Sequence, residues 1–184
     1  MGKVILDMAM SLDGFISGLN NADAGLYDWY FAPAPPSARV KEELIKTLGA
    51  IIMGRRTYGT GDEANGFEDD PYTAARFILT HHPPEKVGKG AESFTFVTDG
   101  IESALRQAKA AVGERDVAIG GGANTAQQYL KAGLVDEIQI HLVPRLVGDG
   151  IRLFDHPGSE PITLETTRVI ESVGVTHLKY RIVK

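Results

Sequence analysis

Short, unbroken apolar runs recur along most of the chain. Such runs are typical of strands that are buried on both faces of a parallel sheet. They predict strands at 4–10, 50–53, 75–80, 94–97, 116–119 and 137–143. We therefore expect a sheet of mainly parallel strands.

Two intervening segments repeat apolar residues at every third or fourth position, which predicts helices. In the first, Ser37 is the expected N-cap, Val40 and Leu44 share one face, and Gly49 ends the pattern. The second begins at Ile101 and is closed by Gly113. Strands that alternate with helices predict an α/β domain with three layers.

The C-terminal part of the chain changes pattern. Residues 163–170 and 175–182 are alternating or β-branched, and a short segment with Gly174 joins them, which predicts an antiparallel hairpin. With 184 residues and 43% hydrophobic content, the chain is long enough for one buried core and short for two. We expect a single domain over residues 1–184.

The composition of the chain limits its possible partners and says less about its fold. The net charge of −5 gives no general attraction to nucleic acid or to an anionic membrane. Cysteine is absent, which excludes disulfides and thiolate nucleophiles. Asp7 interrupts the first apolar run, so no signal peptide is expected, and no run reaches membrane-spanning length. We expect a cytoplasmic protein without a metal, nucleic-acid or membrane partner.

Three consecutive glycines, Gly120–Gly122, separate a predicted strand that ends at Ile119 from a helical pattern that starts with Ala123, Asn124 and Thr125. A glycine turn before a helix binds phosphate well, because backbone N–H groups and the helix dipole point at the ligand. No Gly-Lys-Ser/Thr follows, so this is not a Walker A loop. Thr125 stands where a Rossmann fingerprint has its third glycine. The alternative is a simple tight turn.

A second glycine-rich strand end is Gly54-Arg55-Arg56-Thr57. The arginines can offer forked donors to a phosphate monoester, and Thr57 can offer a hydroxyl to another phosphate. The alternative is a pair of surface arginines that form ion pairs with Asp62 or Glu63. Because a glycine-rich strand end lies beside them, we favour the phosphate interpretation.

Two further features allow two interpretations each. Asp13 is either a turn residue that caps local N–H groups or a group that binds or protonates a substrate. Trp29 and Tyr30 either plug the long segment 19–36 or form an aromatic wall for a planar heterocycle.

The histidines indicate no metal site. His81 and His82 are adjacent, so on a strand they would point to opposite faces, and a nucleotide-edge role is favoured over a shared ion. His141 alternates within an apolar strand and is predicted to be a hydrogen-bonded core residue. The acidic run 68–70 is interpreted as a solvated segment.

Four motifs, in order and over nearly the whole chain, resemble the dihydrofolate-reductase-like superfamily. They are Met10–Ser17, Ile52–Tyr58, Ile119–Gly122 and Val147–Gly150. Within that superfamily they are most similar to the C-terminal reductase domain of the bifunctional riboflavin-biosynthesis deaminase-reductase. The resemblance implies a mostly parallel eight-stranded sheet with an antiparallel last strand. It also implies hydride transfer from NADPH to a nitrogen heterocycle.

The resemblance also implies roles for residues. It assigns Ala9 and Ile16 to the nicotinamide, and Arg55 and Arg56, after Gly54, to the 2′-phosphate. Thr57 and the turn from Ile119 to Thr125 would hold the pyrophosphate, and Thr80 and His81 would lie along the adenosine. A cis peptide is expected at Gly120-Gly121, as in the dihydrofolate reductases.

One departure from the dihydrofolate reductases concerns the substrate. The helix position that carries their pterin-binding carboxylate falls at Ala38 and Arg39 here. Trp29 and Arg39 instead resemble the riboflavin-pathway reductases, where an arginine suits a phosphorylated substrate. The deaminase half of the bifunctional enzyme has no counterpart in this sequence.

The leading hypothesis is an NADPH-dependent reductase of 5-amino-6-(5-phosphoribosylamino)uracil or a related heterocycle, with Asp13 or a water as proton source. One alternative is a dihydrofolate or pterin reductase that uses Asp13 or Asp28. Another is a nucleotide-binding regulatory protein without turnover. A homodimer is expected by analogy.

Overall fold

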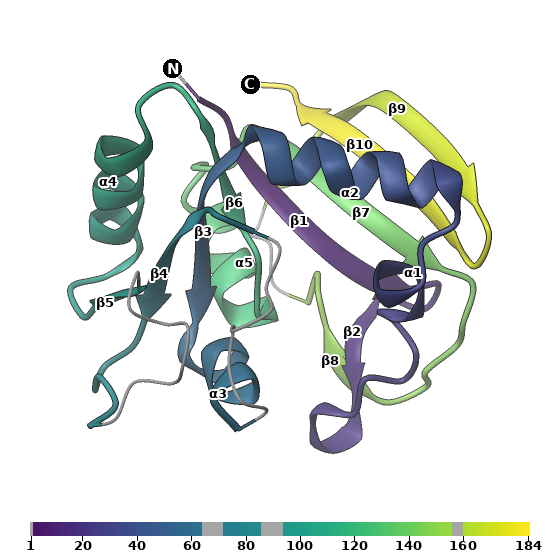
Figure 1. Ribbon diagram of the computed structural model, residues 1–184, viewed down its shortest axis with the longest axis horizontal. Coiled ribbons are helices and arrows are strands. Elements are labelled where there is room, and N and C mark those ends of the chain that lie inside the picture. Colours follow the sequence, from purple (N-terminus) through teal and green to yellow (C-terminus); the bar gives the residue numbers. More distant parts are fainter. Residues whose placement is uncertain (1, 64–71, 86–93, 156–159) are drawn as a thin grey trace.

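An eight-stranded sheet runs through the molecule in the order β5-β4-β3-β6-β1-β7-β10-β9 (Figure 1). The computed structural model describes residues 2–63, 72–85, 94–155 and 160–184. The strands are β1 (Val4–Ser11), β3 (Leu48–Gly54), β4 (Ala75–Leu79), β5 (Phe94–Val97), β6 (Asp116–Ile119), β7 (Glu137–Val143), β9 (Leu164–Ser172) and β10 (Val175–Ile182). Neighbours pair in parallel except that β10 is antiparallel to both β7 and β9. The predicted mostly parallel sheet with a C-terminal hairpin is confirmed.

Helices cover both faces of the sheet. Helices α4 (Ile101–Val112) and α5 (Ala123–Lys131) bury Leu105 and Tyr129 in the main core on one face. Helix α2 (Pro35–Thr47) packs Val40 and Leu44 on the other face, where it crosses in front of the sheet (Figure 1). These are the predicted three layers.

Smaller elements lie beside the sheet. They are β2 (Phe15–Gly18) and β8 (Gly150–Arg152), which form a separate antiparallel pair, η1 (Leu19–Asn21), α1 (Asp28–Phe31) and α3 (Arg55–Glu63). The sequence did not predict them, because each is short or rich in glycine and lacks a clear period.

The start of α2 differs from the prediction. The helix begins at Pro35 with Ala34 as N-cap, because a proline in the first turn has no N–H to satisfy and a φ that suits a helix. Ser37 is therefore inside the helix and is not its N-cap. Its hydroxyl is buried and contacts Ser172 and His177 instead.

The end of α2 also differs. The chain passes directly from Thr47 into β3, so Gly49 is a strand residue and does not end the helix. A β-carbon on Gly49 would lie 2.6 Å from Cβ of Val112. The glycine therefore allows the end of α4 to approach β3 closely.

The parallel strands end at a common edge, at the bottom of Figure 1. Ile52 pairs with Ile119, and Gly54 pairs with Leu79, so the ends of β3, β4 and β6 lie side by side. Ser11 ends β1 at the same edge. Ligands of open α/β sheets bind at this edge. The predicted convergence of the segments at Ser11, Gly54, Thr80 and Gly120 is confirmed.

Part of the predicted acidic surface segment, including the run 68–70, lies outside the described residues. In the parts that are described, no helix has the length and apolar character needed to cross a membrane.

Candidate functional site

The two glycine-rich strand ends are hydrogen-bonded to each other. The Gly54 N–H donates to the Gly121 carbonyl at 2.8 Å, and the Gly120 N–H donates to the Ile52 carbonyl at 2.9 Å. Helix α3 begins with Arg55, immediately after Gly54, and helix α5 begins with Ala123, immediately after Gly122. Two helix N-termini therefore lie together at the carboxyl edge of the sheet.

A threonine of each helix lies against a glycine at the start of the other helix. A β-carbon on Gly54 would lie 2.8 Å from Oγ1 of Thr125, and one on Gly122 would lie 3.6 Å from Oγ1 of Thr57. A β-carbon on Gly121 would lie closer to the same Thr57 oxygen, at 3.2 Å. The φ of Gly121, +126°, also favours glycine. We call Gly54, Thr57, Gly121, Gly122 and Thr125 the glycine-threonine cradle.

The cradle has the features of an anion site. No side chain caps the N-terminus of α5, so its first N–H groups remain available to an acceptor. The dipoles of α3 and α5 add positive potential at the same place. Among its neighbours, the Asn124 side chain is exposed and accepts a hydrogen bond from Gln128. The five residues brought together here were all predicted site residues.

The cis peptide lies one position later than predicted. It joins Gly121 to Gly122, and not Gly120 to Gly121. Gly120 still continues the strand ladder, because its N–H is bonded to Ile52 of β3. The turn therefore starts after Gly120.

The two arginines differ in their surroundings. The Arg55 guanidinium lies 5.0 Å from the ring centroid of Tyr58 and is half-buried. Arg56 is exposed. The side chains of Asp62 and Glu63, the alternative ion-pair partners, lie outside the described residues. Arg55 and Arg56 thus lie on the first turn of α3, next to the cradle.

The predicted adenosine-side residues follow β4. The Thr80 hydroxyl donates to the His82 carbonyl at 2.8 Å and accepts from the His82 N–H at 3.2 Å, so it shapes the turn. His81 and His82 are exposed. The described residues contain no group of three or more metal-ligating side chains.

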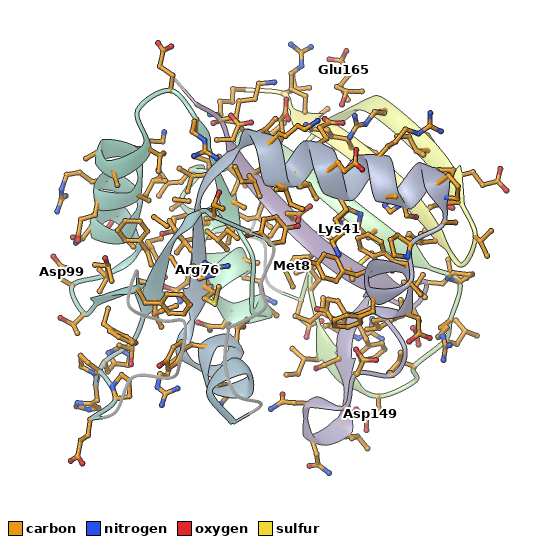
Figure 2. The ribbon with its side chains drawn as sticks, in the orientation of Figure 1. Met8, Lys41, Arg76, Asp99, Asp149 and Glu165 are labelled. Atoms are coloured by element: carbon orange, nitrogen blue, oxygen red, sulfur yellow. The ribbon has the colours of Figure 1, made fainter. Side chains whose placement is uncertain are left out.

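The predicted nicotinamide-side residues are buried. Ala9 belongs to a small cluster with Leu26 and Trp29, and Ile16 belongs to the main core. Met8 points to the other side of β1 from Ala9, and its sulfur would lie 3.7 Å from a β-carbon on Gly121. Met8, labelled in Figure 2, thus connects β1 to the cradle.

Asp13 fixes a loop. Its carboxylate accepts hydrogen bonds from the Ser11 hydroxyl at 2.6 Å and from the N–H groups of Val147 and Gly148 at 3.0 and 2.8 Å. The Ser11 bond, followed by the backbone bonds, lowers the pKa of Asp13 to about 2. The Asp13 carboxylate thus binds N–H groups of a distant loop, where the turn-residue interpretation expects the local ones of its own turn, and it is poorly suited to donate a proton at neutral pH.

The two predicted substrate residues differ in burial. Trp29 is buried, and its ring centroid lies 4.4 Å from that of His141 and 5.0 Å from that of His177. Arg39 is exposed on α2. Lys41 of the same helix reaches toward α1 (Figure 2) and contacts the ring and the carbonyl of Tyr30. Segment 19–36 is therefore anchored to α2 and the sheet.

Trp29 covers a set of polar side chains that the sequence analysis did not recognise. His141 Nε2 lies 3.1 Å from Asp7 Oδ1, the two histidine Nδ1 atoms lie 2.7 Å apart, and His177 Nε2 lies 2.9 Å from Ser37 Oγ. We call these four residues, Asp7, His141, His177 and Ser37, the Asp7 network.

His141 is buried and hydrogen-bonded, so its predicted core role is confirmed. Asp7 and His177 were missed, although a carboxylate inside a buried apolar run is unusual and was itself a signal. Burial, followed by the neighbouring His141, lowers the pKa of His177 to about 4.

The chain is similar in sequence to several known proteins. A family model described as the RibD C-terminal domain matches residues 2–178. The Bacillus subtilis protein YyaP, whose function is uncharacterized, is 26% identical over 97% of this chain and 94% of its own length. The riboflavin biosynthesis protein RibD of Corynebacterium ammoniagenes is 31% identical over 59% of this chain and 34% of its own.

Two crystal structures extend the comparison to the fold. A Shewanella sp. PV-4 protein aligns over 99% of both chains with a TM-score of 0.80 and 24% identity. The Thermotoga maritima diaminohydroxyphosphoribosylaminopyrimidine deaminase/5-amino-6-(5-phosphoribosylamino)uracil reductase aligns over 99% of this chain and 57% of its own, with a TM-score of 0.76 and 16% identity.

Proposed function

Because the chain belongs to the RibD C-terminal domain family, we propose that it is an NADPH-dependent reductase of a phosphorylated aminopyrimidine or a close relative of one. The observation that carries the proposal is the glycine-threonine cradle. A β-carbon at Gly54 or Gly121 would intrude on Thr125 or Thr57. This close packing of two helix N-termini suits the pyrophosphate of a dinucleotide.

The residues around the cradle fit the remaining parts of NADPH. Thr57 and Thr125 would donate their hydroxyls to the pyrophosphate, together with the first N–H groups of α5. Arg55 and Arg56 would bind the 2′-phosphate, since guanidinium groups suit phosphate monoesters. Thr80 and His81 would border the adenosine, and Ala9 and Ile16 the nicotinamide. When bound, NADPH supplies the hydride.

For the substrate, the family relation favours an aminopyrimidine over a pterin. The Thermotoga maritima relative is named as a reductase of 5-amino-6-(5-phosphoribosylamino)uracil. The alternative pterin reductase needs an acid near the substrate, and the two acids considered for it are already engaged. Asp13 binds the 147–148 backbone, and Asp28 is exposed and paired with Arg145 at 3.1 Å. Trp29 and Arg39 remain our proposed substrate-side residues, and a homodimer remains proposed by analogy.

Fluorescence titration of the full chain with NADPH and with NADH tests the cofactor assignment. We expect saturable binding with a preference for NADPH. Thr57→Val and Thr125→Val should each weaken binding about tenfold, since a hydrogen bond to a charged group contributes about 1.5–3 kcal/mol. Thr47→Val, an exposed position at the end of α2, is the control and should bind as the wild type does.

Turnover tests the substrate assignment. NADPH oxidation should accelerate with 5-amino-6-(5-phosphoribosylamino)uracil and not with dihydrofolate. The reverse preference would favour the pterin alternative. Tight NADPH binding without oxidation by either heterocycle would favour the regulatory protein that does not turn over.

A further inference from the structure

The Asp7 network joins four different elements across one face of the sheet. Asp7 comes from β1, His141 from β7, His177 from β10 and Ser37 from α2, which crosses that face in Figure 1. Ser37 Oγ continues the series to Ser172 Oγ of β9 at 2.8 Å. Five polar groups are thus connected by hydrogen bonds from the centre of the sheet to its outer strand.

The interior of this series is buried and its ends are partly exposed. His141 and His177 are each 3% exposed, and Ser37 is fully buried. The Trp29 ring packs against both imidazoles. At the ends, the Asp7 side chain is 18% exposed and Ser172 is half-buried. A proton could enter or leave only at these ends, because Trp29 and the sheet enclose the middle.

Asp7 lies where β1 separates from β6. Residues Val4–Leu6 pair with Val117–Ile119, so Asp7 is the first β1 residue beyond the pairing and is level with Gly120. Asp7 and Ala9 share one face of β1, because side chains alternate along a strand. Asp7 is therefore level with the start of the glycine turn and on the same face of β1 as Ala9, the proposed nicotinamide-side residue.

The hydrogen bonds of the Asp7 network allow two arrangements of its protons. With Asp7 ionised, Ser172 donates to Ser37, Ser37 donates to His177 Nε2, His177 Nδ1–H donates to His141 Nδ1, and His141 Nε2–H donates to Asp7. With Asp7 protonated, every donor and acceptor is exchanged, so that Ser37 donates to Ser172, and every hydrogen bond is kept. Both imidazoles are neutral in each state and differ only in tautomer.

We propose that the Asp7 network supplies the proton of the reduction, with Asp7 as its donor at the substrate and with Ser172 as the entry from solvent. The proposal rests on the proposed function. The acceptor's C=N or C=O bond gains a hydride at carbon, from NADPH, and a proton at nitrogen or oxygen, from Asp7. One proton passes from Ser172 through Ser37, His177 and His141 and restores the Asp7 carboxyl group.

The surroundings of the network favour a neutral His177 imidazole. His177 keeps a depressed pKa because it is buried. Tyr27, near Asp7, has a raised pKa because of burial, then Asp23 and Asp7, and so remains neutral. Arg168 of β9 also faces His177, but it pairs with Glu43 of α2 at 2.7 Å.

The network could instead have a purely structural role and only fix α2 on the sheet. Nuclear magnetic resonance of the full chain labelled with ¹⁵N-histidine distinguishes this role from proton transfer. The proposal expects single N–H protons on His141 Nε2 and His177 Nδ1 while Asp7 is ionised. Both tautomers should invert together when Asp7 is protonated, and this inversion should be absent in Asp7→Asn. Fixed or independently changing tautomers in the wild type would overturn the proton transfer.

Kinetics tests whether this transfer serves the reaction. Asp7→Asn should lower kcat about a hundredfold or more, the usual range for loss of a general acid, while the Kd for NADPH changes less than twofold. Ser37→Ala should lower kcat several-fold and change a curved proton inventory in H₂O/D₂O mixtures to a linear one. Ser103→Ala, a buried serine of α4 that accepts hydrogen bonds from Arg106 and Gln107, is the control and should leave kcat unchanged.

Different results would overturn the proton-donor role of Asp7 and the reductase function. Wild-type kcat in Asp7→Asn, or a curved inventory in Ser37→Ala, overturns the Asp7 network as proton source and leaves the reductase function standing. A wild-type chain that neither binds NADPH nor reduces any heterocycle overturns the reductase function and, with it, the catalytic role of Asp7. The tautomer measurement needs no turnover, so it decides in either case whether the network conducts a proton.

Discussion

The hydroxyl oxygen of Thr125 lies 2.8 Å from the place that a β-carbon on Gly54 would occupy. The two residues are far apart in sequence: Gly54 immediately precedes α3, and Thr125 lies in the first turn of α5. Real β-carbons do not tolerate so short a contact, and Thr125 is buried among its neighbours, so the pair permits only glycine at position 54 without rearrangement.

Gly54→Ala should destabilise the fold and weaken NADPH binding together. The added methyl group pushes Thr125 and the start of α5 away, and overpacking of this kind costs about 1–3 kcal/mol. Urea unfolding and NADPH titration measure the two effects. Gly18→Ala is the matched control, since a β-carbon there has ordinary contacts of 3.5 Å or more. Equal behaviour of the two variants would contradict the cradle.

The double change Arg55→Ala, Arg56→Ala should remove the preference for NADPH over NADH. Each charge-assisted bond to the 2′-phosphate contributes about 1.5–3 kcal/mol, so NADPH affinity should fall at least about tenfold while NADH affinity changes little. Lys46→Ala, which removes an exposed charge at the end of α2, should preserve the preference. An equal loss for both dinucleotides would argue against 2′-phosphate recognition.

Asp13→Asn should destabilise the fold and remove a pH dependence. The folded-state pKa of Asp13 is depressed to about 2 by the Ser11 hydroxyl and the 147–148 amides. Its contribution to stability is therefore present above its ordinary value near 3.8 and is lost as the pH falls toward 2. Urea midpoints between pH 5 and pH 2 measure this loss. The decline should be smaller in Asp13→Asn and unchanged in Asp99→Asn, an exposed carboxylate labelled in Figure 2.

Because of His177, the free energy of unfolding should decrease in mild acid. Its folded-state pKa of about 4 lies below the ordinary 6.5, so the unfolded chain binds a proton first. Its stabilising effect is complete above pH 6.5 and is lost as the pH falls from 6.5 toward 4, by up to about 1.4 kcal/mol per pH unit. Urea unfolding across this range should show the slope in the wild type. The slope should decrease in His177→Gln and persist in His82→Gln, whose histidine is exposed.

The sequence predicted the strands that bury both faces, because a continuous apolar run leaves few alternatives. It also placed Gly54, Thr57, Gly120–Gly122 and Thr125 at one edge, because parallel strands end together. Helix α3 was missed, since three glycines over 54–61 hide its period. The N-cap at Ser37 was wrong because Pro35 starts the helix.

The sequence by itself determined the class of fold and the edge of the sheet at which the glycine-rich segments meet, since both follow from local pattern, and its four motifs together indicated the family. The tertiary structure alone decided which side chains meet. Thr125 faces Gly54. Asp13 accepts hydrogen bonds from the 147–148 backbone. Asp7 is connected by hydrogen bonds to His141, His177 and Ser37. Such contacts depend on strand order and register, which bring together residues up to 140 positions apart and which no local period encodes.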